Sequence, residues 1–171
     1  MGVNFGNDNE LRALAESVAK IPLNWSATPL VPGAKSGAAL QDVTDPSDRR
    51  RKIGTKQQAD AATIERALAN GVVAQPDWDH LPAASRAKIL EYAAELLEQR
   101  RAQFVAMLVR EAGKTLPAAI SEVREAADMC RYYAAMARKL FGHPEELPGP
   151  TGESNQLSLH GRGVFVCISP W

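Results

Sequence analysis

The side chains best suited to covalent or acid–base chemistry in this sequence are two cysteines and one glutamate. Cys167 lies inside the apolar run 164–168, where forming a thiolate is costly. Cys130 lies in the apolar stripe of a predicted helix, and the same argument applies. Both are therefore predicted to be buried structural thiols, and neither is assigned to catalysis. Glu125 belongs to the same helix as Cys130, where a solvated carboxylate is the expected role.

The three histidines, His80, His143 and His160, have no cysteine, histidine or carboxylate neighbours at the spacing of metal ligands. The sequence therefore predicts no metal site.

The apolar run 164–168 is the element that would position a binding site at the end of the sequence. Residues 164–168 are unbroken β-branched, aromatic and cysteine positions, which predicts a strand covered on both faces, as in a parallel sheet. Such a strand needs neighbours and a crossover helix, and no later residues supply them. Ligands of open α/β sheets bind where parallel strands end, which here means Ile168, Ser169, Pro170 and Trp171. On residues alone, an ordinary strand exit with the tryptophan in the core is favoured over a ligand site at these residues.

Charge and cysteine content narrow the classes of protein. The 171 residues contain 20 basic and 20 acidic side chains, and this balance argues against a nucleic-acid surface. The basic run 49–52 is predicted to be a solvated turn flank, with a phosphate contact as the alternative. No apolar stretch approaches the roughly 20 residues of a transmembrane helix, and residues 1–5 do not resemble a signal peptide. Two distant cysteines suggest a reducing, cytoplasmic setting.

The sequence predicts four helices. Asn7 and Glu10 form a capping-box pattern before a helix that ends by Pro22. Asp60 is the predicted N-cap of a short helix closed by residues 70–71. Two longer helices follow, one from Pro82 to the stop at Gly113 and one from Pro117. The last of these carries an apolar seam: Ile120, Val123, Ala127, Cys130, Ala134, Ala137 and Phe141.

Strands are predicted to be few. Residues 22–48 are rich in Pro, Gly, Ser and Ala and are predicted to be an irregular linker. Within and beyond it, residues 40–43 are expected to pair with a short strand at 52–55. Residues 156–160 alternate polar and apolar, as a strand with one exposed face would.

Several strings resemble the first part of the NAD(P)-dependent aldehyde dehydrogenase superfamily. Within it, the sequence is most similar to the L-glutamate γ-semialdehyde (Δ1-pyrroline-5-carboxylate) dehydrogenase domain of bifunctional proline utilization proteins. The matching strings are residues 2–5 (GVNF), Trp78, 86–90 (RAKIL), 109–117 (VREAGKTLP), 122–125 (EVRE), 147–153 (LPGPTGE) and 159–171 (LHGRGVFVCISPW).

This resemblance implies an incomplete α/β, Rossmann-like NAD-binding domain, helix-rich with a few strands. The implied division is residues 1–48 as N-terminal helix and linker, and 49–171 as a partial domain truncated after its first buried strand. The resemblance also implies that residues 168–171 contact NAD and that Glu125 lies on a helix lining the aldehyde tunnel. The catalytic cysteine and glutamate of the family would follow Trp171, so the chain alone is expected to be inactive. FAD would belong only to an upstream domain of the parent, the longer protein of which these residues would be a part.

The parent is expected to oxidise L-glutamate γ-semialdehyde to L-glutamate, in the cytoplasm and as a homo-oligomer. Its expected partners are the aldehyde, NAD and the rest of the same polypeptide. Two alternatives stay open from the sequence. One is a fragment of an aldehyde dehydrogenase with another substrate, and the other is a non-catalytic helical interaction module.

Overall fold

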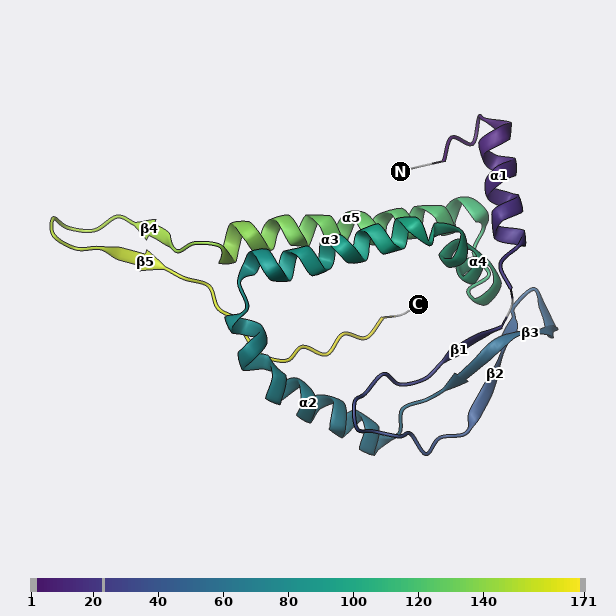
Figure 1. Ribbon diagram of the computed structural model, residues 1–171, viewed down its shortest axis with the longest axis horizontal. Helices are drawn as coiled ribbons and strands as arrows, with labels where there is room; N and C mark the ends of the chain where they lie inside the picture. Colours follow the sequence, from purple (N-terminus) through teal and green to yellow (C-terminus); the bar gives the residue numbers. More distant parts are fainter. Residues whose placement is uncertain (1–2, 23, 170–171) are drawn as a thin grey trace.

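A long antiparallel helix pair forms the centre of the protein, seen here in a computed structural model that describes residues 3–22 and 24–169. The pair consists of α3 (Ala83–Gln99) and α5 (Leu116–Phe141), which lie side by side along the length of α3 (Figure 1). Two ion pairs connect the helices, Arg138 with Glu91 at 2.6 Å and Arg131 with Glu98 at 2.7 Å.

Small side chains allow the two helices to approach closely. Ala87 and Ala94 of α3 and Ala134 of α5 are fully buried, and Ala127 is 1% exposed. Four of the predicted seam positions are therefore in the core, namely Ile120, Val123, Ala127 and Ala134. Cys130 is half-buried, and Phe141 is exposed at the end of the helix.

The main apolar cluster lies at the end of the pair away from Phe141, where α4 (Arg101–Glu111) crosses the start of α5. It also takes in Leu14 of α1 (Asp8–Ala19). Its buried members are Leu14, Val105, Ala119, Ile120 and Val123. The predicted capping box on α1 is present in modified form. Asn7 Oδ1 accepts hydrogen bonds from the amides of Asn9 and Glu10, and Glu10 accepts from the Asn7 side-chain amide.

A three-stranded sheet packs beside α4. Strand β3 (Asp48–Gln57) is central, between β1 (Trp25–Ala27), which is parallel to it, and β2 (Leu40–Asp45), which is antiparallel. The predicted hairpin is thus confirmed, with Val43 opposite Gly54. The linker prediction is wrong at 25–27, because it missed β1. A three-residue strand flanked by proline leaves too short a pattern to detect, and its pairing depends on Gly54, where a Cβ would lie 2.2 Å from the Trp25 carbonyl oxygen.

The next helix is longer than predicted. Helix α2 runs from Ala61 to His80, through Gly71 and Pro76, so the predicted end at 70–71 is wrong. Gly71 does not take the positive φ of a helix-terminating glycine, and the Asn70 side-chain Nδ2 donates to the carbonyl oxygen of Pro32 at 3.0 Å. The N-cap prediction is confirmed, because Asp60 Oδ1 accepts from the Thr63 amide at 2.8 Å.

The helix predicted from Pro82 to Gly113 is two helices. Arg100 leaves the helical region, with φ −98° and ψ 19°, and separates α3 from α4. Neither glycine nor proline marks this break, and the turn lets α4 fold back toward α1 and the sheet. Gly113 does stop α4, with φ +66°.

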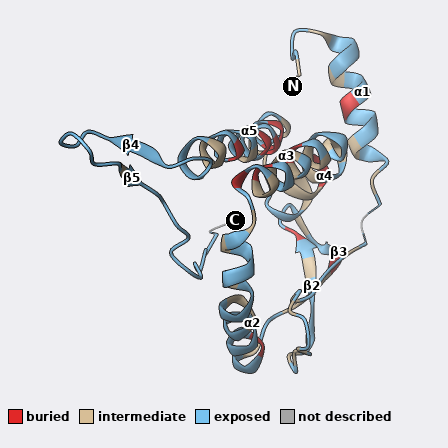
Figure 2. Ribbon diagram, turned by 60° about the vertical axis from the view of Figure 1, so that its left-hand side comes forward, coloured by how far each residue is buried: buried red, intermediate tan, exposed pale blue. Residues whose placement is uncertain are grey.

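The last residues extend away from this core. Strands β4 (Glu145–Leu147) and β5 (Asn155–Leu157) form a projecting hairpin, so the predicted strand at 156–160 is confirmed only at its start (Figure 1). Residues 158–169 then run back without strand pairing. Figure 2 shows the buried residues concentrated in the helical core, whereas the hairpin and the final segment are exposed.

Candidate functional site

The final segment holds the predicted cofactor contacts. Ile168 is 90% exposed and Ser169 is also exposed, while Pro170 and Trp171 lie outside the described residues. The prediction of a buried strand at 164–168 is therefore wrong in this structure. A covered strand needs sheet neighbours on both sides, and none of the five strands in the described ranges pairs with these residues.

Helix α2 is what the final segment lies against. The Gly161 amide donates to Asp79 Oδ1 at 2.7 Å. Three residues later, Val164 packs over Gly71, where an added Cβ would lie 3.3 Å from the Val164 Cγ2 atom. The segment is thus held at two points along one helix, and its apolar residues still face solvent, with Phe165 75% and Val166 69% exposed.

Neither cysteine is in the environment predicted for it. Cys167 is exposed and Cys130 is half-buried, so the prediction of two buried thiols is wrong for Cys167 and only partly met for Cys130. The physical reason for Cys167 is the same as for its neighbours, since burial of that run depends on strands that do not pair with it here.

Glu125 projects from the exposed face of α5. Its neighbour Arg124 pairs with Asp128 at 3.5 Å, as their i, i+4 spacing suggests. An apolar hollow of about 500 Å³ lies between α3, α4 and α5, lined on α5 by Glu122, Val123 and Ala126. Glu125 is not among its lining residues, so the solvated role expected from the residues alone matches its position here.

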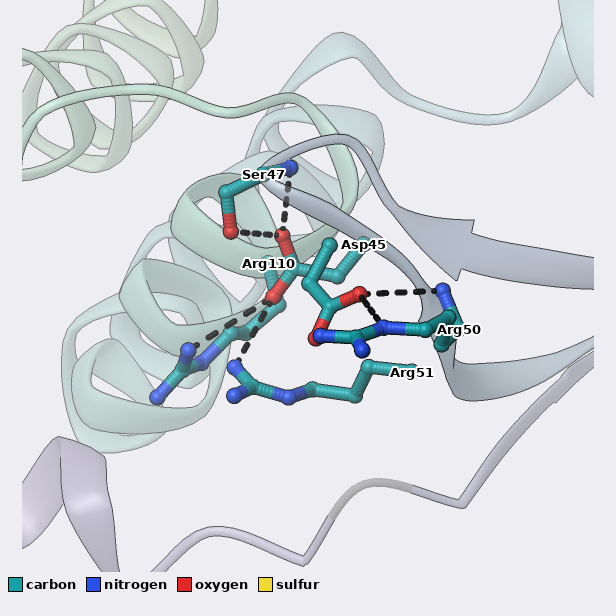
Figure 3. Close-up of polar contacts among 6 residues, drawn as sticks. Asp45, Ser47, Arg50, Arg51 and Arg110 are labelled. Carbon is teal, nitrogen blue, oxygen red and sulfur yellow. Dashed lines mark hydrogen bonds and ion pairs between the residues drawn. The ribbon is translucent and has the colours of Figure 1, made fainter.

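A buried carboxylate that sequence reasoning missed joins the sheet to α4. Asp45 is 2% exposed and accepts hydrogen bonds from both the amide and the hydroxyl of Ser47, at 2.9 and 2.5 Å (Figure 3). Arg51 of β3 and Arg110 of α4 approach its other oxygen, at 3.3 and 3.6 Å. The Ser47 hydrogen bonds, together with the two arginines, hold the pKa of Asp45 below its usual range.

The basic run 49–52 is largely neutralised by aspartates of the same hairpin. Arg50 pairs with Asp48 at 2.9 Å and Lys52 with Asp42 at 2.6 Å, besides the Arg51–Asp45 pair. These ion pairs favour the predicted solvated turn flank over a phosphate contact, and the run itself lies in strand β3. The sequence offered a weaker signal, because the hairpin brings aspartates and basic residues onto neighbouring strands, although Asp42 lies opposite Thr55 and Lys52 opposite Thr44.

The described residues do not by themselves offer a pyrophosphate cradle. A dinucleotide site needs a glycine-rich turn that leads from a strand into a helix. The β3–α2 connection is Gln58-Ala59-Asp60, and the Asp60 carboxylate already occupies the amides of Thr63 and Gly37, each at 2.8 Å. A negative side chain at that helix start opposes a phosphate. Likewise, no cluster of three or more metal-ligating side chains occurs in residues 3–22 and 24–169.

The helical core, the hairpin sheet and the final segment together match a known family. The model of the aldehyde dehydrogenase family matches residues 33–171, and the chain belongs to this family. The family uses NAD(P) as cofactor. Among curated relatives, the bifunctional protein PutA of Klebsiella aerogenes is 34% identical over 171 residues, covering 99% of this chain.

Solved structures agree with this assignment. A mutant of proline utilization A (PutA) from Bradyrhizobium japonicum matches 95% of the chain with 40% identity and a TM-score of 0.71, covering 13% of that protein. A mutant of 1-pyrroline-5-carboxylate dehydrogenase from Thermus thermophilus matches 86% of the chain with 27% identity and a TM-score of 0.74, covering 29% of that protein.

The chain spans 12% of the length of the PutA relative from Klebsiella aerogenes. It therefore corresponds to a small part of the proteins it resembles. The match begins at residue 33 and the β2–β3 hairpin crosses residue 48, so the division at 48 stays a prediction about domains. Within the described ranges, no helix is both long enough and apolar enough to cross a membrane.

Proposed function

We propose that this chain forms the first part of an aldehyde dehydrogenase domain that oxidises L-glutamate γ-semialdehyde to L-glutamate with NAD+, in cytoplasmic proline breakdown. The observation that carries this proposal is the 34% identity to a PutA protein along 99% of the chain. The likeness to PutA and pyrroline-5-carboxylate dehydrogenase structures supports it.

In this proposal the chain supplies positioning rather than chemistry. Residues 168–171 contact NAD, and Glu125 lines the path of the aldehyde, once a sheet is built around the final segment. The nucleophile and base come from residues outside this sequence, FAD is confined to an upstream domain, and the complete enzyme is a homo-oligomer. The uncovered run 164–168 supports this arrangement, because Val164, Phe165, Val166 and Ile168 are apolar and 43–90% exposed.

An activity assay on two polypeptides tests the proposal. The 171-residue chain and the complete reading frame that contains it are purified, and NADH formation is followed with pyrroline-5-carboxylate. We expect activity only from the complete product. Turnover by the 171-residue chain alone would contradict the proposed division of labour.

The choice of aldehyde is tested in the same assay. A probable succinate-semialdehyde dehydrogenase of Synechocystis is 36% identical over 92 residues, so succinate semialdehyde is the informative competitor. We expect a higher kcat/KM with pyrroline-5-carboxylate. A preference for succinate semialdehyde would retain the family and overturn the proposed substrate.

A further inference from the structure

A small polar cavity lies where four segments of the chain meet. The end of α2, the start of α3, the end of α5 and residues 158–160 enclose about 260 Å³. All three histidines of the sequence line it, although they come from distant segments. His80 ends α2, His143 follows α5, and His160 follows β5. The fold therefore brings together three imidazoles that are far apart in the sequence.

Arg86 of α3 adds a permanent positive charge to the same cavity. Its guanidinium carbon lies 5.5 Å from the centre of the Phe141 ring. Its Nε atom is buried and has no hydrogen-bond acceptor among the residues that the structure describes. The buried Nε is out of reach of a ligand in the cavity, so Arg86 offers such a ligand its positive charge rather than this hydrogen bond.

Among the described residues, one acidic side chain lines the cavity, and it is already engaged. Asp79 Oδ1 accepts the Gly161 amide hydrogen at 2.7 Å. His80 Nδ1 lies 2.6 Å from the Pro76 carbonyl oxygen, and a carbonyl can only accept, so this nitrogen carries the hydrogen. The Nε2 of His80 is then an acceptor in the neutral ring and a donor in the protonated one.

From this arrangement we propose that the cavity binds a small oxyanion, a free carboxylate, phosphate or sulfate. Arg86 supplies the permanent positive charge, and His80, His143 and His160 line the same cavity. Histidine is the side chain whose charge changes between about pH 5 and 8. A cavity lined by an arginine and histidines, with Asp79 as its acidic member, is therefore expected to bind an anion more tightly as the pH falls. A cation is disfavoured by the same balance.

Titration calorimetry with sulfate tests the proposal on the 171-residue chain, because sulfate keeps its double charge across the pH range used. Binding is measured at about pH 5.5 and about pH 8, with ionic strength held constant by sodium chloride. We expect binding about tenfold tighter at the lower pH, the scale of one charge-assisted hydrogen bond. Equal affinity at both pH values, or no detectable binding at the lower one, would overturn the site.

Variants separate the cavity from general surface charge. Arg86→Gln should abolish sulfate binding, and His160→Gln, at an exposed position, should weaken the pH response without removing the ring contact of Phe141. Arg124→Gln is the matched control, because it loses the same charge about 25 Å along α5 from Phe141. Equal loss of affinity in Arg124→Gln and His160→Gln would show diffuse attraction and contradict the proposal. Circular dichroism checks that each variant is folded.

A carboxylate arm identifies the class of anion. Acetate and inorganic phosphate are titrated at the lower pH beside sulfate. Competition of all three for one site supports a general oxyanion site. Independent binding of acetate or phosphate in the presence of saturating sulfate would contradict a single shared cavity.

Discussion

Two regions of this molecule carry similar apolar patterns and differ in whether the chain covers them. In the α3–α5 pair, Ala87, Ala94 and Ala134 are completely buried because each helix covers the other. On α2 and the final segment, Val73 is 80% and Ile168 90% exposed. The contrast shows that an apolar run indicates what a segment needs, whereas burial depends on partners elsewhere in the chain.

The uncovered side chains form a substantial set. On α2 the exposed large apolar residues are Ile64, Leu68, Val72, Val73 and Trp78, and on the final segment they are Leu159, Val164, Phe165, Val166 and Ile168. Contiguous exposed apolar surface is uncommon on isolated soluble proteins. The uncovered surface therefore indicates that these residues form part of a larger folded domain rather than a stand-alone helical module.

The largest expected effect distinguishes the two regions directly. Ile120→Ala removes a side chain that is 4% exposed in the core cluster, so it should lower the free energy of unfolding by about 2–5 kcal/mol. Ile64→Ala is the matched control on α2, where the side chain is 52% exposed, and should change it by less than about 0.5 kcal/mol. Urea denaturation followed by circular dichroism measures both. Equal losses would mean that α2 is covered in solution.

A second expectation concerns the exposed surface itself. Replacing Val72 and Val73 together by serine should reduce the fluorescence of a dye that binds apolar surface, because both side chains face solvent. Ala62→Ser with Ala69→Ser, at exposed positions of the same helix, is the control and should leave the fluorescence nearly unchanged. Size-exclusion chromatography is run in parallel. If the unsubstituted 171-residue chain is monodisperse and does not bind the dye, the result would favour the helical interaction module.

A smaller effect tests how firmly the final segment lies on α2. Gly71→Ala should stabilise the helix by up to about 1 kcal/mol, because alanine is the better helix former. The added Cβ would lie 3.3 Å from Val164 Cγ2, so a firmly held segment reduces this gain. Chemical denaturation of Gly71→Ala with and without Val164→Ala measures the difference. A gain that is independent of Val164 would show that the segment leaves the helix in solution.

The last expected effect is a pH dependence of stability at the start of α2. The Thr63 side chain first, then the Gly37 and Thr63 amides, lower the pKa of Asp60 to about 2. An unfolded aspartate titrates near about 3.9, so this stabilisation is complete above that pH and is lost as the pH falls toward 2. Asp60→Asn keeps the cap oxygen without the charge, so it should lower the stability at neutral pH and flatten the acid limb of the stability curve. An unchanged acid limb would show that other carboxylates control it.

The sequence predicted the elements whose signals are local. Asn7 and Asp60 are caps, Gly113 is a stop, and the hairpin around Val43 and Gly54 is paired as expected. The errors arose where tertiary contacts decide. Arg100 breaks a helix without a breaking residue, and Gly71 continues one because no chain reversal is needed there.

The candidate site was predictable only in part for the same reason. The resemblance carried by residues 109–117 and 159–171 led to the family, which the match to 33–171 confirms. Burial of Cys167 and of the run around it depends on pairing that this chain does not make, so no local pattern could report its exposure. Asp45 was missed because one of its partners, Arg110, comes from an element far away in the sequence.

The two acid–base bridges between α3 and α5 have a consequence beyond their modest strength. Glu91 and Glu98 are about two turns apart on one helix, and their partners Arg138 and Arg131 are spaced likewise on the other. Exposed ion pairs of this kind stabilise a protein little. However, a displacement of one helix along the other by a single turn would break both ion pairs at once. The two ion pairs therefore fix the relative alignment of the helices, which the small alanine side chains packed between them would not determine by themselves.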